Sequence, residues 1–399
     1  MVQADWRTAT QIAGDVEAGR PVRVGLHSAI GHVLAQPVAA LADLPAFPCA
    51  DQSGFAVRGF GPWTVRGNGN PQEGDAAPIT AGAAIPEGCD AVLPNSEALL
   101  EQGARFTHVS VGDPRTGQPA RRAGELPLGY GVRQPQASAA KGDLLIKSGV
   151  RVSAGTAALA AAAGADDLTV IPPPTIAPVL RNGGLLSDGP PRRGKDRAVL
   201  ATLAPAWAMM SGARSLPEVT APEKPAALAD AIDAAGGDIV LVTPSSSAET
   251  LDTAMAALKR LGATILISEI VCQPGGRTLY AELTDGRRVL CLPLDPSAAM
   301  VALATILTPA LHALAGSPHL SRPAKAMLRR GVTGNAADRA IPVIIEKGEL
   351  ADLADPQPWS GPADLGPFSV ADGIAFIEQG RGEAHESVSI VPIPGADTR

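Results

Sequence analysis

The alternation of apolar strands and helices between residues 175 and 316 constrains the fold most strongly. The run Asp238–Thr243 is almost continuously apolar, as in a strand that is buried on both faces of a parallel sheet. Other elements alternate around it: strands at 175–180 and 264–271, and helices at about 196–212 and from 248 to 262. Strands and helices in this order predict a doubly wound, mainly parallel α/β sheet.

Two further strands, Thr278–Leu283 and Arg287–Leu292, flank the turn sequence Thr284–Gly286 and predict a β-hairpin. The second strand leads through a Pro-containing turn into residues 297–316, which contain no Asp, Glu, Lys or Arg. This stretch is long enough to suggest a membrane span. Because it follows a strand directly and includes His312, we instead expect a buried helix and no membrane association.

Composition shifts along the 399 residues indicate several domains. Gly and Pro interrupt short alternating runs between residues 45 and 135, including Phe106–Val111, which predicts a β-rich domain. Three consecutive prolines at 172–174 mark a boundary after an Ala-rich helix, Ala154–Ala163. We expect these parts: a split N-terminal domain at 1–44 and 136–171, an inserted β-rich domain at 45–135, an α/β domain at 172–316 and a C-terminal β domain at 317–399.

Charge and cysteine content narrow the function classes. A net charge of −7 argues against a nucleic-acid partner, which requires clustered Lys and Arg. The four cysteines form no C-x-x-C pair and have no nearby His at metal-ligand spacing, so we expect reduced, mostly buried thiols. The first residues include Asp5 and no apolar core of a signal peptide, which predicts a cytoplasmic protein.

Three loops should meet where the parallel strands end, which is where open α/β sheets bind ligands. Two of them precede helices, whose free N–H groups favour phosphate or carboxylate. The serines add hydroxyl donors, although Ser247 is equally explained as a helix N-cap. The candidate ligand-binding residues in these loops are Asn182, Gly183, Gly184, Ser245, Ser246, Ser247, Pro293, Asp295 and Ser297.

A fourth loop, Gln273–Arg277, is another candidate for an anion. Its residues Gly275 and Gly276 would let the backbone approach a ligand, and Arg277 could bind a phosphate; Pro274 completes the set. An ordinary glycine turn with a solvated Arg277 is the alternative. Likewise, the basic residues Arg192, Arg193, Lys195 and Arg197 could approach an anion, but a solvated surface loop is the preferred interpretation.

Several segments, in order, resemble the molybdopterin molybdenumtransferase family, the MoeA and gephyrin E-domain type. The segment LPAFPCADQSGFAVR at 44–58 is similar to the family's L-P-x-F-x-x-S-x-M-D-G-[YF]-A-V-R. The segment ITAGAAIPEGCDAV at 79–92 resembles I-x-T-G-A-x-x-P-x-G-A-D-A-V and is the strongest match. Residues 132–153, 244–252, 273–277 and 293–298 fall where the family carries its other motifs, so the resemblance spans nearly the whole chain.

The resemblance implies a four-domain fold, homodimerisation and a role in molybdenum cofactor biosynthesis, with a molybdoenzyme as a further partner. The family inserts molybdate into molybdopterin and hydrolyses an adenylylated intermediate. The implied ligands are therefore molybdopterin or its adenylylated form, and Mg²⁺ is the implied metal. Such chemistry needs carboxylates for the cation and cationic groups for molybdate and pyrophosphate.

The chain departs from the family pattern mainly at ionisable positions. Neutral residues stand at the family's Asp, Thr, Glu-Asp, Asp-Glu and both Lys positions, namely Ser53, Ala81, Ala137, Ser138, Gly183, Gly184, Gln273 and Gly276; Leu294 and Asp295 replace its Gly-Asn. Asp252 and Asp51 remain, and together with Ser53 they are the weak catalytic candidates. Losing one preorganised donor typically lowers a rate by about 10²–10³-fold, so these changes predict little activity.

Two functional hypotheses follow: a divergent but working transferase, and a non-catalytic relative that carries or scaffolds molybdopterin or a nucleotide. Residue chemistry favours the second. A nicotinamide-dependent oxidoreductase is disfavoured because no G-x-G-x-x-G motif follows the first strand of the α/β domain.

Overall fold

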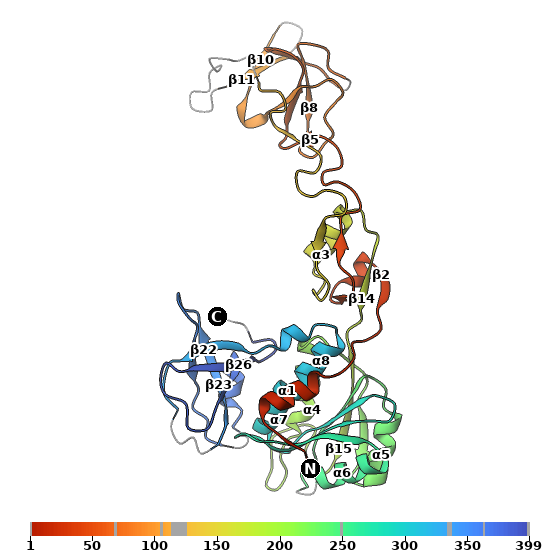
Figure 1. The fold of residues 1–399 in the computed structure, drawn as a ribbon, viewed down its shortest axis with the longest axis vertical. Helices are drawn as coiled ribbons and strands as arrows, with labels where there is room; N and C mark the ends of the chain where they lie inside the picture. The colour runs from red at the N-terminus through yellow and green to blue at the C-terminus, as the bar shows by residue number, and fades with distance from the viewer. Residues whose placement is uncertain are drawn as a thin grey trace.

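The structure is a computed structural model that describes residues 2–67, 70–103, 107–112, 126–247, 250–332, 337–361 and 364–396. The molecule is elongated (Figure 1). A β-rich domain lies at one end, the α/β domain and the C-terminal barrel lie side by side at the other, and a small domain with α3 lies between them.

The α/β domain is built on an eight-stranded sheet with the order β1-β19-β20-β21-β18-β15-β16, in which β17 also pairs with β15. The strands are β1 (Gln3–Ala4), β15 (Thr175–Asn182), β16 (Arg214–Ser215), β17 (Val219–Pro222), β18 (Ile239–Val242), β19 (Thr264–Ile270), β20 (Gly276–Glu282) and β21 (Arg288–Cys291). Five of the strand pairs are parallel; β20 pairs antiparallel with both β19 and β21. The predicted mainly parallel sheet and its hairpin are therefore confirmed.

Helices cover both faces of this sheet. One face packs against α1 (Trp6–Gly14), α4 (Val199–Met210), α7 (Pro296–Ala302) and α8 (Thr308–Leu314). The other packs against α5 (Pro225–Ala234) and α6 (Thr250–Arg260). Because both faces are covered, the central strand β18 is buried at every residue, as its apolar sequence predicts.

The N-terminal strand and helix join the α/β domain, although the sequence prediction grouped residues 1–44 with the split domain. Strand β1 pairs parallel with β19, and Ala9 and Ala13 of α1 are fully buried against the sheet. The Trp6 ring also stacks on Phe376 of the C-terminal barrel at a centroid distance of 4.4 Å. This aromatic contact ties the first helix to both neighbouring parts of the chain.

The long apolar helix runs from Pro296 to Leu314, and 94% of its most apolar window is buried inside the protein. By length and composition alone it could cross a membrane, with a mean hydropathy of 1.6. The burial shows that it is a core helix, as expected. Its middle, Leu303–Leu307, is a π-helical turn between α7 and α8.

The small domain combines two distant parts of the sequence. Its sheet is β2 (Val22–Gly25), β14 (Asp167–Ile171) and β3 (Val33–Leu34), with a second pair, β4 (Val38–Ala39) and β13 (Leu144–Ile146). Helices α2 (Leu26–Ala29) and α3 (Ala154–Ala162) complete its core. Gly164 follows α3 with a positive φ of 93°, the C-terminal conformation that glycine favours.

The distal β-rich domain has a six-stranded sheet with the order β10-β11-β7-β8-β6-β9. Its strands are β6 (Gly54–Val57), β7 (Trp63–Val65), β8 (Asp75–Ile79), β9 (Ala91–Pro94), β10 (Ala98–Gln102) and β11 (Thr107–Val111), with a separate pair, β5 (Cys49–Ala50) and β12 (Val132–Arg133). The predicted run Phe106–Val111 is found as β11 from Thr107 onward; Phe106 lies outside the described residues. Fully buried Trp63 lies in its core.

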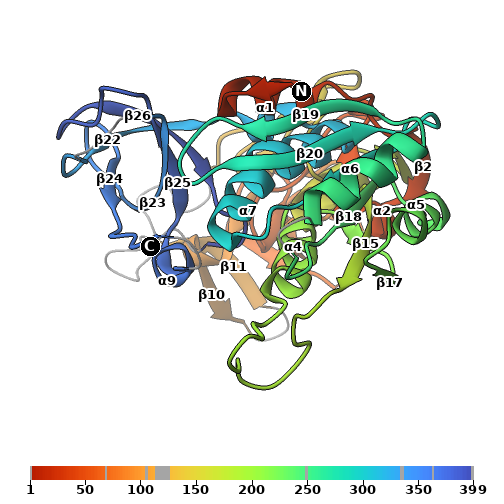
Figure 2. The same ribbon diagram turned by 90° about the horizontal axis from the view of Figure 1, so that it is seen from below.

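The C-terminal β domain is a closed barrel in the order β22-β24-β23-β25-β26 (Figure 2). Its strands are β22 (Ala324–Leu328), β23 (Arg339–Glu346), β24 (Leu353–Pro356), β25 (Gly373–Ile377) and β26 (Ser387–Pro392), and the short helix α9 (Gly366–Val370) precedes β25. This barrel agrees with the β domain that the sequence predicts at the C-terminus. Apart from the position of β1 and α1, the domain limits drawn from the sequence stay predictions.

Candidate functional site

The four candidate loops lie at one edge of the α/β sheet. Strands β15, β18 and β21 are parallel, so the loops that follow them emerge at the same edge. Strand β20 runs antiparallel to β21 with Leu279 opposite Cys291, which brings the start of β20, and with it Gln273–Arg277, to that edge. Sequence reasoning therefore placed the first three loops together correctly but did not locate the fourth loop, Gln273–Arg277. The role of all four as ligand contacts stays a prediction.

The two glycines after β15 fit against the serines after β18. A Cβ atom on Gly183 would lie 2.5 Å from the Cβ of Ser245, and one on Gly184 would lie 2.2 Å from Ser246 Oγ. Ser246 also donates to the Gly183 carbonyl through its backbone N–H, at 2.8 Å, and its hydroxyl, at 2.6 Å. The glycines therefore allow the neighbouring serine loop of the same chain to approach closely, rather than a ligand.

The serine loop is bonded internally to the first turn of α6. The Ser245 hydroxyl is fully buried and lies 3.3 Å from Thr250 Oγ1, which also accepts from the Ser245 N–H at 3.1 Å. The Ser247 N–H points to Ser245 Oγ at 3.4 Å. Ser246, which is exposed, and half-buried Ser247 are therefore the serines that a ligand could reach here.

Beneath these loops lies a buried arginine that the sequence interpretation did not single out. The side chain of Arg181 is 1% exposed and donates from Nη1 to the Thr250 carbonyl at 2.6 Å. Its Nη2 lies 2.7 Å from Glu223 Oε1, which makes an ion pair. Among the described residues, however, neither of these two atoms nor Arg181 Nε has a hydrogen bond of good geometry. Burial lowers the pKa of Arg181, and the Glu223 carboxylate opposes that shift. A charged residue at the end of an apolar strand was the available signal.

Arg277, the candidate cation of the glycine loop, pairs with Asp252. Their Nη2 and Oδ1 atoms are 2.5 Å apart, and both side chains are largely exposed. The Arg277 guanidinium lowers the pKa of the Asp252 carboxyl, so this acid stays ionised. A candidate catalytic acid and a candidate anion-binding cation thus neutralise each other.

The N-terminus of α7 is covered by the C-terminal barrel. Asp295 is the N-cap and accepts from the Ser297 N–H at 3.0 Å. Ser297 is fully buried, and its hydroxyl accepts from the indole N–H of Trp359 at 3.3 Å. With Pro293 also buried, this helix end offers its capping groups to the protein itself.

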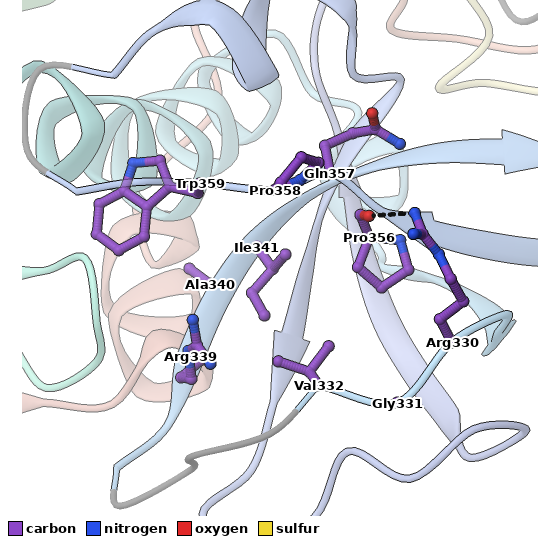
Figure 3. A pocket seen from close by; sticks show the side chains of 10 residues that line it. All are labelled: Arg330, Gly331, Val332, Arg339, Ala340, Ile341, Pro356, Gln357, Pro358 and Trp359. Atoms are coloured by element: carbon purple, nitrogen blue, oxygen red, sulfur yellow. Dashed lines mark hydrogen bonds between the residues drawn. The ribbon is translucent and has the colours of Figure 1, made fainter.

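A cavity of about 260 Å³ lies where the barrel meets this edge of the sheet (Figure 3). Arg330 lines one side, where its Nε pairs with Asp355 Oδ1 at 2.7 Å and its Nη2 donates to the Pro356 carbonyl at 3.0 Å. Trp359 lines the other side. Arg339, at the start of β23, also lines the cavity, and its backbone forms an isolated parallel β-bridge with Gln273 of the glycine loop. Two arginines and an aromatic ring that no motif pointed to therefore lie next to the candidate loops.

Asp51 and Ser53 lie in the distal β-rich domain, far from the α/β loops of the same chain (Figure 1). Asp51 is exposed and lies 3.9 Å from the guanidinium of Arg133. The Ser53 hydroxyl accepts from the Ala81 N–H at 3.0 Å, which joins the two strongest resemblance segments. The structure brings these two candidates together with each other but not with Asp252.

The residues that the structure describes do not fit the implied Mg²⁺. Within the described parts of the chain, no group of three or more His, Cys, Asp or Glu side chains could hold a metal ion. Magnesium is bound by carboxylates that supplement its water ligands. At the loops, Asp252 and Glu223 each pair with an arginine, and Asp295 caps α7.

The predicted basic loop forms a small hairpin between β15 and α4 that projects from the domain (Figure 2). Arg192 and Lys195 pair through two backbone hydrogen bonds of 3.0 and 2.8 Å, and Arg192, Arg193 and Lys195 are exposed. The interpretation as a surface loop agrees with this exposure.

All four cysteines are free, as expected; Cys49 and Cys291 are buried, whereas Cys89 and Cys272 are half-buried.

Fold and site together define a multi-domain α/β protein. It has a split N-terminal domain, an inserted β domain, a doubly wound sheet with candidate ligand-binding loops at one edge, and a C-terminal barrel. Residues 4–164 match the family model described as the MoeA N-terminal region, domains I and II. This match supports assignment of the chain to the MoeA family.

Individual relatives extend the likeness along the chain. A molybdopterin molybdenumtransferase of Bacillus subtilis is 27% identical over 382 residues, which cover 89% of this chain and 84% of that protein. One of Staphylococcus aureus is 23% identical over 74% of this chain and 72% of its own length. The crystal structure of a molybdopterin biosynthesis MoeA protein from Pyrococcus horikoshii has the same fold, with a TM-score of 0.73 at 20% identity, covering 99% of this chain and 100% of that one.

Proposed function

We propose that this chain is a molybdopterin-binding protein of molybdenum cofactor biosynthesis in which the ionic groups needed for molybdate insertion are largely lost. The observation that carries this proposal is the mutual neutralisation of Asp252 and Arg277 at the edge of the sheet. A reaction that moves molybdate and releases an anionic leaving group needs preorganised charges directed at the reacting atoms. A 2.5 Å ion pair directs these two charges at each other.

The fit of the glycine loop supports the same conclusion. Gly183 and Gly184 stand where the family resemblance implies an Asp-Glu pair, and neither position has space for a Cβ atom beside Ser245 and Ser246. Acidic side chains at these positions would therefore require the serine loop to move. The glycine loop after β15 and the serine loop after β18 thus fit together closely and leave no space for carboxylate side chains at these two positions.

Binding of an anionic pterin remains supported by the cavity that Arg330, Arg339 and Trp359 line. Guanidinium groups bind phosphate, and an indole ring offers an apolar face to a planar heterocycle. The proposed ligand is molybdopterin or its adenylylated form, which would lie between this cavity and the exposed Ser246.

The test has two measurements on the purified full chain. Isothermal titration with molybdopterin and with its adenylylated form should show binding. Incubation of the adenylylated form with molybdate and Mg²⁺ should release little or no adenosine monophosphate, while the Bacillus subtilis molybdopterin molybdenumtransferase, assayed in parallel, serves as the positive control. Release at the rate of that control would refute the loss of catalysis, and absence of binding to either pterin would refute the binding function.

An active molybdenumtransferase is the second candidate, favoured by the similarity to the Bacillus subtilis enzyme over 89% of this chain. Catalysis would then need Asp51 and Ser53 to approach the α/β loops. Because their domain lies at the far end of the molecule, these residues would have to come from a second copy of the chain. We therefore propose a homodimer, association with a molybdoenzyme as carrier or scaffold, and a cytoplasmic location. Sedimentation equilibrium showing a monomer at micromolar concentration would reject the dimer.

A further inference from the structure

A second cavity, of about 460 Å³, lies at the junction of three parts of the chain and away from the candidate loops. Arg151 of the split domain, Met209 and Met210 at the end of α4, His312 of α8 and Pro392 at the end of β26 line it. Strand β16, which follows α4, pairs with the first residues of β15. The cavity therefore lies at the opposite edge of the sheet from the loops that follow β15, β18 and β21.

The π-helical turn Leu303–Leu307 orients the polar side of this cavity. The Thr308 hydroxyl donates to the carbonyl of Leu303, five residues earlier, at 3.1 Å. A π turn carries an extra residue, and one residue corresponds to a rotation of about 100° around a helix. Thr308 and His312, four residues apart and so on one face of α8, both line the cavity as a result. Such turns are rare and are frequently found at functional sites.

The polar groups of the cavity are cationic or neutral. The Nδ1 atom of His312 is engaged with Ser321 Oγ at 2.7 Å, which leaves Nε2 to bind a ligand. Arg151 donates from Nη1 to the Gly31 carbonyl at 3.2 Å, and no carboxylate pairs with Arg151 in the described parts of the chain.

Gly212 brings the guanidinium of Arg151 to the wall of the cavity. A Cβ atom at Gly212, where φ is +94°, would lie 2.5 Å from Nη2 of Arg151. Glycine is therefore required here both for the backbone conformation and for the close approach of the arginine.

We propose that this cavity binds a small organic carboxylate with an apolar body. Arg151 takes the carboxylate, His312 Nε2 adds a hydrogen bond, and Met209, Met210 and Pro392 contact the apolar part. Its volume falls within the range of about 300–1,000 Å³ that is usual for small-molecule sites. Because the ligand would contact the split domain, the α/β domain and the end of the barrel, it would hold these three parts in one arrangement.

The protonation of the imidazole agrees with a single negative charge on the ligand. Burial, together with the charges of Arg151 and His319, lowers the pKa of His312 to about 4. At neutral pH the imidazole is uncharged, so Arg151 is the cation that a carboxylate would meet.

The experiment uses the full chain, with 2-naphthoate as the probe and its neutral amide, 2-naphthamide, as the comparison. Titration calorimetry should show tighter binding of the acid by at least about tenfold, the usual effect of a hydrogen bond to a charged group. Hydrogen–deuterium exchange should slow in the peptides that contain Met209–Gly212 and Thr308–Leu314. Equal affinities for the two probes would overturn the proposal. So would the absence of 2-naphthoate binding when the probe is in about tenfold excess over the chain, at probe concentrations up to about 10 mM.

Arg151→Gln is the decisive variant, because this exposed residue can be changed without opening the core. It should weaken 2-naphthoate by at least about tenfold and leave 2-naphthamide unchanged, which shows that the cavity is intact. Arg260→Gln, an exposed arginine at the end of α6 on the other face of the sheet, is the matched control and should bind as the native chain does. Loss of binding in Arg330→Gln with full binding in Arg151→Gln would assign the probe to the other cavity and refute this site.

Discussion

Replacing Gly184 by alanine should destabilise the α/β domain through a clash with one serine. Gly184 has a φ of +74°, a conformation that costs a residue with a Cβ atom about 1 kcal/mol. The new Cβ atom would also lie 2.2 Å from Ser246 Oγ. The hydroxyl must rotate away and give up its bond to the Gly183 carbonyl, which adds about 1 kcal/mol. We expect a total loss of about 2–3 kcal/mol.

Gly189→Ala is the matched control, since Gly189 has a similar φ of +71° but nothing lies within 4 Å of an added Cβ atom. It should cost only the conformational part, about 1 kcal/mol. Combining Gly184→Ala with Ser246→Ala should cost about 1 kcal/mol less than the sum of the single changes, because the clash and the lost hydrogen bond are then counted once.

The measurement is native-state hydrogen exchange of the β18 amides, which reports the free energy of opening this domain. Equal losses for Gly184→Ala and Gly189→Ala, or strict additivity of the double variant, would refute the matched fit of the two loops.

Three other outcomes follow from the contacts of the site. Asp252→Asn should raise the affinity for inorganic phosphate several-fold in titration calorimetry without changing the denaturation midpoint, because it releases an exposed Arg277 from its ion pair; unchanged affinity would contradict this. Glu223→Gln should lower the free energy of unfolding by about 2 kcal/mol, since it leaves the Arg181 charge buried without its carboxylate, whereas exposed Glu218→Gln should have no effect; urea titration separates the two. Burial raises the pKa of three thiols, to about 11 for Cys89 and about 12 for Cys272 and Cys291. A raised pKa leaves little thiolate below that pH, so a disulfide reagent should label these three slowly at pH 8 and faster as the pH rises toward 11; rapid labelling at pH 8 would contradict it.

The sequence predicted well those elements whose burial produces a short, recognisable pattern of apolar residues. Strand β18 is apolar because helices cover both of its faces, and the β20–β21 hairpin has a Gly-containing turn. Residues 213–237 carried no prediction, yet they contain β16, β17 and α5. Helix α5 is rich in alanine, which contributes little to a hydrophobic pattern, and the two strands are too short and too exposed to show alternation.

The N-terminal strand shows a second limit of local patterns. Strand β1 has two residues, and its place in the sheet depends on pairing with Glu269 and Ile270 more than 260 positions along the chain. Ser268 reinforces that pairing by donating to the Val2 carbonyl at 2.9 Å. A pairing of such sequence separation has no signature within a window of neighbouring residues, so the sequence did not place this segment in the α/β domain.

At the candidate site, the sequence located the loops but not the partners of their side chains. The pairing of Arg277 with Asp252 spans 25 residues, and the bonding of Ser246 to Gly183 spans 63. These contacts decide the chemistry, because an arginine directed at a carboxylate of its own chain contributes far less to anion binding than one held toward an open site. The arginines that line the adjacent cavity come from the barrel, outside every resemblance segment. If the proposed function is correct, a ligand phosphate should be bound beside Trp359, next to Arg330 and Arg339, rather than by the loops that follow the parallel strands.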